Sequence, residues 1–205
     1  GKSTLINLIP RYYDVTKGSV KVDGVDVRDM TQKELRDKLG YVPQKGVLFS
    51  GTIDSNIRYG KPEITDAQVK EAAEVAQATE FIDTKPEKYE SPVSQGGTNV
   101  SGGQKQRLSI ARAIAKDPEI FIFDDSFSAL DFKTDSQLRK ALKEYTKDAT
   151  TVIVAQRIST ILGADQIIVL DDGHMAGIGT HKELMANCEV YQQIARSQLS
   201  EEELA

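Results

Sequence analysis

Apolar residues along this chain fall into runs with strand spacing and runs with helix spacing. Short apolar runs at Ile120–Phe123, Thr151–Ala155 and Gln166–Leu170 predict buried strands. Between the first two runs, from about Thr134 to Tyr145, apolar residues recur every three or four positions, which predicts an amphipathic helix. Strands that alternate with helices indicate an α/β fold built on a parallel sheet.

The amino-terminal part adds short helices and an antiparallel turn. Lys2–Ile9 predicts a short helix that Pro10 ends, and Ser19–Val27 predicts a hairpin around an Asp-Gly turn. A further helix is expected at Thr31–Lys38, followed by a short strand at Gly40–Val42. These elements predict a small antiparallel β part before the first strand of the main sheet.

From about residue 52 to residue 115 the pattern is helical. Thr65 with Gln68 forms a capping box that predicts a helix through Ala78, and Ser101–Ala115 begins with a second capping box. We therefore expect one domain over 1–205, with a core at about 1–51 and 116–187, an inserted helical subdomain at about 52–115, and a tail at 188–205. A third capping box at Thr180 and Glu183 predicts a late helix, and the acidic end at Ser200–Ala205 is expected to fray.

Composition narrows the classes of partner. The chain is 39% hydrophobic and 28% charged, as in ordinary globular proteins, and its net charge of −5 disfavours a nucleic-acid surface. No run of about 18 apolar residues predicts a membrane-spanning helix. The single cysteine, Cys188, excludes an internal disulfide and is expected to be a structural thiol in a reducing compartment.

The first four residues, Gly1, Lys2, Ser3 and Thr4, match the end of a phosphate-binding loop. In such a loop, backbone N–H groups hold phosphate oxygens, the lysine reaches the β- and γ-phosphates, and the serine hydroxyl binds Mg²⁺. We expect the rest of the loop to precede Gly1, so that the chain is truncated at its amino terminus. A plain surface turn is the alternative for so short a match.

Two aspartates follow the apolar run at Ile120–Phe123. In a nucleotide site, Asp124 would hold Mg²⁺ through water, and Asp125 would face the attacking water. A buried strand ending in polar residues is common by itself. Its pairing with a phosphate loop about 120 residues earlier favours the functional interpretation.

A glycine pair opens the predicted helix at Ser101–Ala115. Ser101 and Gln104 would cap this helix, and Gly102 and Gly103 would let a phosphate approach its backbone, where the helix dipole favours an anion. The alternative is a capped amphipathic helix with no ligand.

These motifs together resemble the ATP-binding-cassette (ABC) family, and the string Ser101–Arg107 is the most specific of them. Within that family the chain resembles the nucleotide-binding domain of an exporter over nearly all of its length. The resemblance implies a P-loop NTPase (RecA-like) core with a parallel sheet, a small antiparallel β part and an inserted helical subdomain. The exporter-like segments are Tyr41–Gln44 with Leu48–Ile53 and Asn56-Ile57 (the Q-loop), Ser128, Ala129, Leu130 and Asp131 (the D-loop), and Gly179–Leu184.

The resemblance implies ATP and Mg²⁺ as ligands. By position, residues 1–4 bind nucleotide, and Ser3, Gln44 and Asp124 hold the metal. Gln44 also senses the attacking water and couples to membrane helices. Ser101–Gln104 would bind the γ-phosphate of ATP held by a second nucleotide-binding domain, in a head-to-tail dimer. The implied partners are that second domain and a transmembrane domain, without nucleic acid, at the cytoplasmic face of the cell membrane.

Three positions depart from the family pattern. Asp125 stands where the family has a glutamate general base, so its carboxylate is retracted by roughly 1.5 Å. A misplacement of about 1 Å can lower the rate about 100-fold. Gln156 replaces the switch histidine, and its amide can donate to a γ-phosphate but cannot become cationic. Gln95 and Gly96 replace a Glu-Arg pair.

We therefore hypothesise one half of a heterodimeric exporter, in which Asp125 and Gln156 build a slow site and the intact signature completes the site of a partner. One alternative is a regulatory module that holds ATP without turnover. Another is a non-transport ABC protein acting on DNA or ribosomes, which the exporter-like Ser50–Ile53 and the acidic charge disfavour.

Overall fold

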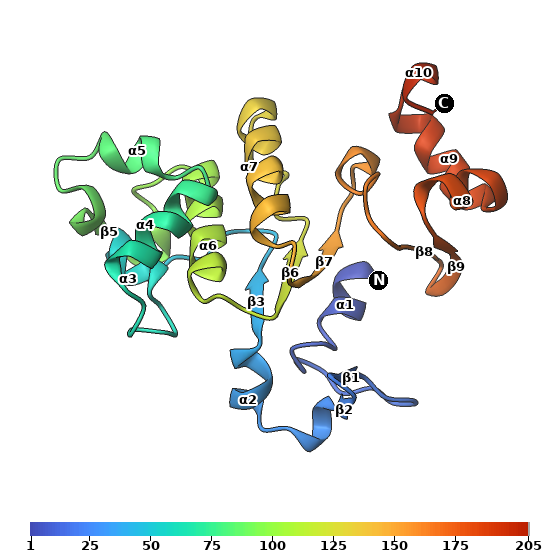
Figure 1. The fold of residues 1–205 in the computed structure, drawn as a ribbon, viewed down its shortest axis with the longest axis horizontal. Helices are drawn as coiled ribbons and strands as arrows, with labels where there is room; N and C mark the ends of the chain where they lie inside the picture. The colour runs from blue at the N-terminus through green and yellow to red at the C-terminus, as the bar shows by residue number, and fades with distance from the viewer. Residues whose placement is uncertain (205) are drawn as a thin grey trace.

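A three-stranded parallel sheet lies at the middle of the chain in the computed structural model, which describes residues 1–204 (Figure 1). The strand order is β3-β6-β7, and the register places Val42 beside Phe123 and Asp124 beside Val154. All three carboxyl ends therefore meet at one edge, which is where loops carry functional side chains in α/β folds. The strands are β3 (Leu39–Val42), β6 (Ile120–Asp124) and β7 (Thr150–Val154).

The third predicted strand does not join this sheet. β8 (Ile167–Asp171) pairs antiparallel with β9 (His174–Gly179), a strand that the sequence pattern did not predict. The turn between them is Asp172-Gly173, and both residues have positive φ (46° and 77°), as a two-residue hairpin requires. The expectation of a further parallel strand here was wrong, because β8 lies in a separate two-stranded sheet and the two-residue turn to β9 imposes antiparallel pairing.

The small antiparallel part near the amino terminus is confirmed. β1 (Lys21–Val22) and β2 (Val25–Asp26) form the hairpin around Asp23-Gly24, again with both φ values positive. The preceding helix α1 (Lys2–Ile6) is shorter than predicted, because 3₁₀-type bonds from Leu8 and Ile9 tighten the chain before Pro10. The 3₁₀ turn η1 (Val27–Asp29) and α2 (Gln32–Asp37) follow.

The segment between β3 and β6 is mostly helical, as predicted. Its helix α4 ends before the predicted Ala78, because Gln77 has left-handed φ (59°) and turns the chain. A two-residue antiparallel pair, β4 (Gly51–Thr52) with β5 (Pro92–Val93), closes the segment. The other elements are α3 (Ile53–Ile57), α4 (Asp66–Val75), α5 (Thr79–Asp83), η2 (Lys88–Glu90), η3 (Gln95–Gly97) and α6 (Gly102–Ala115).

One apolar core joins this helical segment to the parallel sheet. Ala72 of α4, Ile110 of α6, Phe121 of β6 and Leu138 of α7 (Phe132–Tyr145) belong to the same buried cluster. The helix α7 (Phe132–Tyr145) begins earlier than predicted, because the Asp131 side chain caps it by accepting from the Thr134 N–H. Helices therefore pack against the sheet residues that precede the site.

The carboxyl-terminal part has a buried cluster of its own, beside β8 and β9 (Figure 1). Cys188 is buried in it, in line with a structural thiol. Ser200 and Glu203 cap a short helix, so the expected fraying was wrong for residues 200–204, and Ala205 lies outside the described residues. Across residues 1–204, none of the helices combines the length and apolarity needed to cross a membrane. The late elements are η4 (Ile158–Thr160), α8 (His181–Asn187), α9 (Glu189–Gln198) and α10 (Glu201–Leu204).

Candidate functional site

The structure brings the first predicted motif to the end of the middle strand. The Ser3 Oγ atom donates a hydrogen bond of 2.9 Å to Asp124 Oδ1, across a sequence separation of 121 residues. Asp124 is buried, whereas residues 1–4 are exposed on and before α1. A hydroxyl beside a carboxylate is the hard oxygen donor set that Mg²⁺ prefers, and Mg²⁺ usually takes only one or two carboxylates together with substrate phosphates. The residues therefore fit the predicted metal.

Asp125 makes a different contact from its neighbour Asp124. Gln44 Nε2 donates to Asp125 Oδ2 at 3.2 Å, and this bond leaves the Gln44 carbonyl oxygen available to a ligand. Asp125 has left-handed φ (49°), a conformation in which aspartate is several-fold enriched, and its N–H donates to the Val154 carbonyl at 2.8 Å. Asp124 thus accepts a hydrogen bond from Ser3, whereas Asp125 accepts one from Gln44.

A hollow of about 140 Å³ adjoins Asp125. Gln156, which follows β7, lies in its wall together with Ser128 of the predicted D-loop. Asp135 also reaches this wall, and its buried Oδ1 has no hydrogen-bond partner among the described residues. The structure therefore brings Asp125 and Gln156 to one cavity with polar and apolar walls. The remaining lining residues are Phe127, Val154, Ala155, Arg157 and Thr160.

The loop that carries Asp125 is locked onto the sheet by a residue that sequence reasoning missed. Ser126 is 1% exposed, and its Oγ donates a bond of 2.7 Å to the Val42 carbonyl at the end of β3. A serine beside two aspartates carries no signal of this role, because its partner lies on another strand. The bond fixes how Asp125 leaves the sheet.

Removing this bond should destabilise the chain. In Ser126→Ala the Val42 carbonyl loses a partner in a buried place, which costs about 1–3 kcal/mol in the free energy of unfolding. Urea denaturation measures this value, and Ser19→Ala is the control because Ser19 is exposed and lies outside the site. A loss below about 0.5 kcal/mol, the range of ordinary surface substitutions, would contradict the locking role.

The predicted Q-loop segment packs on α6. Gln106, 1% exposed, donates from Nε2 to the Pro43 carbonyl at 3.0 Å, directly before Gln44. A Cβ atom on Gly46 would lie 2.7 Å from the Lys105 carbonyl oxygen, so this glycine allows the close approach. The start of α6 and the loop of Gln44 are therefore mechanically joined.

Ser101–Gln104 opens α6 with the predicted capping box. Gln104 N donates to Ser101 Oγ at 3.2 Å, and Ser101 N donates to Gln104 Oε1 at 3.1 Å. A Cβ atom on Gly102 would meet nothing within 4 Å, whereas one on Gly103 would lie 3.5 Å from the Ala129 carbonyl oxygen. Packing within this chain therefore does not require glycine at 102. Ser101–Gln104 do not line the hollow beside Asp125 in the described part of the chain.

The predicted D-loop, residues 128–131, connects β6 to α7. Ser128 Oγ donates to the Asp125 carbonyl at 3.2 Å, Leu130 is buried, and Asp131 caps α7. The Thr134 hydroxyl and N–H hold the pKa of Asp131 below its usual value by bonding its carboxylate. Asp131 therefore stays ionised as a cap.

The segment Gln95-Gly96, which departs from the family pattern, has a backbone that suits glycine. Gly96 and Gly97 both have left-handed φ (70° and 65°), and a Cβ on Gly97 would lie 3.1 Å from the Leu48 side chain. Asn99 closes this turn by accepting from the Ser94 N–H at 3.0 Å. The change to glycine goes with a local turn that was not predicted separately.

Tyr41 links the sheet to the segment after α1. Its hydroxyl donates to Asn7 Oδ1 at 3.1 Å, while burial and the nearby Asp124 charge raise the pKa of Tyr41 to about 12. The phenol therefore stays protonated and able to donate at all ordinary pH values. This bond helps to hold α1 beside Asp124.

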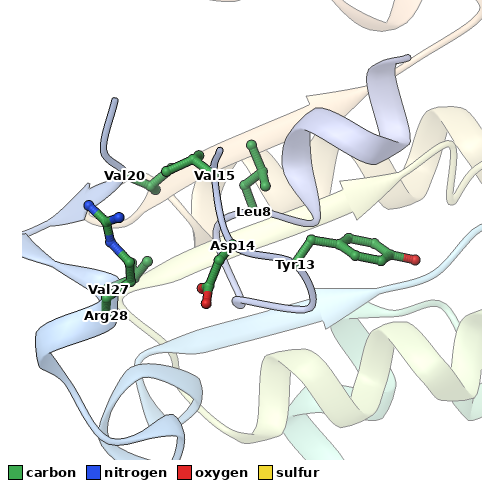
Figure 2. Close-up of a pocket in the computed structure, with 7 residues that line it drawn as sticks. All are labelled: Leu8, Tyr13, Asp14, Val15, Val20, Val27 and Arg28. Carbon is green, nitrogen blue, oxygen red and sulfur yellow. The ribbon is translucent and has the colours of Figure 1, made fainter. Parts of the chain in front are cut away.

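A second hollow lies away from these residues. Figure 2 shows it between the segment after α1 and the hairpin, with Leu8, Val20 and Val27 forming an apolar floor and the Tyr13 ring pointing away. It contains neither the aspartate pair nor Gln44 or Gln156, so we do not assign the chemistry to it.

Comparisons with known proteins identify the family to which the sequence is similar. The family model described as "ABC transporter" matches residues 1–128. An uncharacterized ABC transporter ATP-binding protein of Mycobacterium tuberculosis is 49% identical over 201 residues, which is 97% of this chain and 34% of that protein. A Staphylococcus aureus protein, provisionally named a multidrug export ATP-binding/permease protein, is 48% identical over 194 residues, 95% of this chain and 34% of that protein.

A solved structure has the same fold. The structure of a bacterial Atm1-family ABC exporter with ATP bound superimposes with a TM-score of 0.93 at 40% sequence identity. The match covers 98% of this chain and 35% of that one. This chain thus spans about a third of the length of the relatives that it matches.

Proposed function

The chain belongs to the ABC transporter family, and we therefore propose that it is the ATP-binding domain of an exporter, in which ATP hydrolysis powers transport. The contact between Ser3 and Asp124 carries the proposal, because it joins a phosphate-loop serine to a strand-end aspartate at 2.9 Å. The curated relative named for multidrug export and the ATP-bound exporter structure support it.

In this proposal the side chains of the site divide the binding and the chemistry among them. Lys2 and the backbone of residues 1–4 would bind the phosphates, and Ser3, Asp124 and Gln44 would hold Mg²⁺. Mg²⁺, when bound, neutralises charge on the phosphate oxygens. Asp125 accepts a proton from the attacking water, and Gln44 orients that water through its bond to Asp125 Oδ2. Gln156 donates its amide to the γ-phosphate.

The proposed partners are a transmembrane domain and a second nucleotide-binding domain, which place the chain at the cytoplasmic face of a membrane. Gly102 supports a second nucleotide-binding domain as partner, since a Cβ atom at this position would meet nothing within 4 Å and a phosphate from outside the chain could approach. The proposed division within the chain keeps residues 52–115 as the helical subdomain. The net charge of −5 supports the absence of nucleic acid among the partners.

We propose further that this chain's own site is slow and that its signature completes a faster site on a different partner chain. The support is a contrast within the chain. Asp125 has a shorter side chain than the family's glutamate and Gln156 is uncharged, whereas Ser101–Gln104 keeps the family's signature. The second candidate is a regulatory module that retains ATP with no turnover, which the same two residues favour. Residual turnover at this site separates the two.

Binding of ATP tests the main proposal. Ser3→Ala removes a metal ligand and the bond to Asp124, so the affinity for ATP in the presence of Mg²⁺ should fall about tenfold, the equivalent of one charge-assisted hydrogen bond. Affinity in EDTA should change much less, because only the metal-dependent part is lost. Calorimetry on the full-length protein measures both, with Ser19→Ala, an exposed serine outside the site, as the control. Equal losses with and without Mg²⁺ would refute the metal site.

A further inference from the structure

The turn that follows β7 is held by a residue far along the chain. Gln198, the last residue of α9, donates from Nε2 to the Gln156 carbonyl at 2.8 Å. Its Oε1 accepts from the Ile158 N–H, also at 2.8 Å. Only one orientation of the amide makes both bonds, so the side chain is fixed at both ends.

These bonds matter because the turn has little other backbone support. β7 ends at Val154, and residues 155–157 belong to no helix or strand, so their backbone groups need partners from side chains or water. Gln198 satisfies one acceptor and one donor on either side of Arg157. The amide thereby sets the direction in which Gln156 leaves the sheet.

The same turn is anchored in the carboxyl-terminal cluster. Ile158 is 4% exposed and belongs to the cluster that contains Tyr191 and Ala195 of α9. From the other side, Arg139 of α7 donates to the Ser159 carbonyl at 3.2 Å and pairs with Asp135 at 3.1 Å. Figure 1 shows the segment after β7 between α7 and the carboxyl-terminal helices.

We infer that Gln198 is a positioning residue for Gln156 and that α9 is thereby coupled to the nucleotide site. The inference rests on the proposed function, in which Gln156 faces the γ-phosphate. Displacement of α9 would move the turn through the Gln198 bonds to the Gln156 carbonyl and the Ile158 N–H, and the site would lose preference for a nucleotide that has a γ-phosphate. Binding of ADP, which lacks that group, would be unaffected.

The test compares Gln198→Met with Gln193→Met in the full-length protein. Methionine keeps the length and helix propensity of glutamine but removes both bonds, and Gln193 is an exposed residue of the same helix. Affinity is measured for Mg²⁺–ADP and for a non-hydrolysable imido analogue of ATP, together with the thermal unfolding midpoint. Gln198→Met should weaken the analogue about threefold to tenfold. It should change ADP binding less than about twofold. Gln193→Met should change the affinity for either ligand less than about twofold.

A double-mutant cycle with Gln156→Ala separates this inference from the proposed function. If Gln198 acts through Gln156, adding Gln198→Met to Gln156→Ala produces no further loss of analogue affinity. Equal weakening of analogue and ADP, or additive losses, would overturn the positioning role while leaving the function of Gln156 intact. If Gln156→Ala itself leaves analogue binding unchanged, the assignment of Gln156 to the γ-phosphate is wrong, and the inference falls with it.

Discussion

Replacing Gly102 by aspartate is expected to lower ATP turnover of the assembled transporter about 100-fold or more, without unfolding the chain. A Cβ atom at 102 meets nothing within 4 Å in this chain, so the fold tolerates the side chain. In the proposed dimer the same position faces the γ-phosphate of the partner's ATP, where a carboxylate repels the phosphate and removes electrostatic stabilisation on the scale of about 100-fold. Steady-state ATP turnover measures the loss.

A matched control is available for Gly102. Gly163 is also exposed, and a Cβ there also meets nothing within 4 Å, so Gly163→Asp adds the same charge away from the signature. Its turnover should stay near that of the unaltered protein, and ATP binding at this chain's own site should be normal in both variants. Unaltered turnover in Gly102→Asp would show that the signature does not complete a partner's site.

Lengthening the Asp125 side chain should accelerate turnover at this chain's own site. Asp125→Glu advances the carboxylate by roughly 1.5 Å, and recovery of about 1 Å of misplacement is worth about 100-fold. The gain should be smaller in the single variant than in Asp125→Glu combined with Gln156→His, because the imidazole adds a group that can carry positive charge. Single-turnover kinetics with the partner's site inactivated isolates the rate at this site.

The backbone at position 125 sets a second expectation for the same variant. Asp125 has φ of 49°, a region that aspartate tolerates better than glutamate, so Asp125→Glu should be slightly less stable than the natural chain. A faster but less stable protein is therefore the expected combination. If the rate at this site is unchanged in Asp125→Glu, side-chain length is not the cause of slow turnover.

Local signals predicted much of the fold. The capping boxes at Thr65, Ser101 and Thr180 were predicted correctly, because each is made by residues three positions apart. The pairing of β8 with β9 was missed although its Asp172-Gly173 turn is the same local signal as Asp23-Gly24, because alanine and glycines weaken the strand pattern of β9. The shortened α1 and the ordered end at Ser200 were also missed, since weak propensities there yield to local hydrogen bonds.

Some residues of the candidate site were predicted from the sequence and others were missed. Ser3 and Asp124 were placed together from two motifs whose combined chemistry is specific, and the structure joins them. Ser126 and Gln198 act through backbone atoms that are 84 and 42 residues away in sequence, and backbone partners leave no mark on residue type. A sequence therefore identifies side chains that touch ligand more readily than those that hold the loops in place.

We propose that this chain's own site binds ATP well and hydrolyses it slowly, and that fast turnover takes place at a site completed on a partner chain. The most direct measurement is Mg²⁺-dependent ATP turnover by the full-length protein without any partner chain, made alongside ATP binding on the same sample. We predict tight binding with negligible turnover. Brisk turnover by the protein alone would contradict the claim, because Asp125 would then serve as an efficient base in a self-sufficient homodimer.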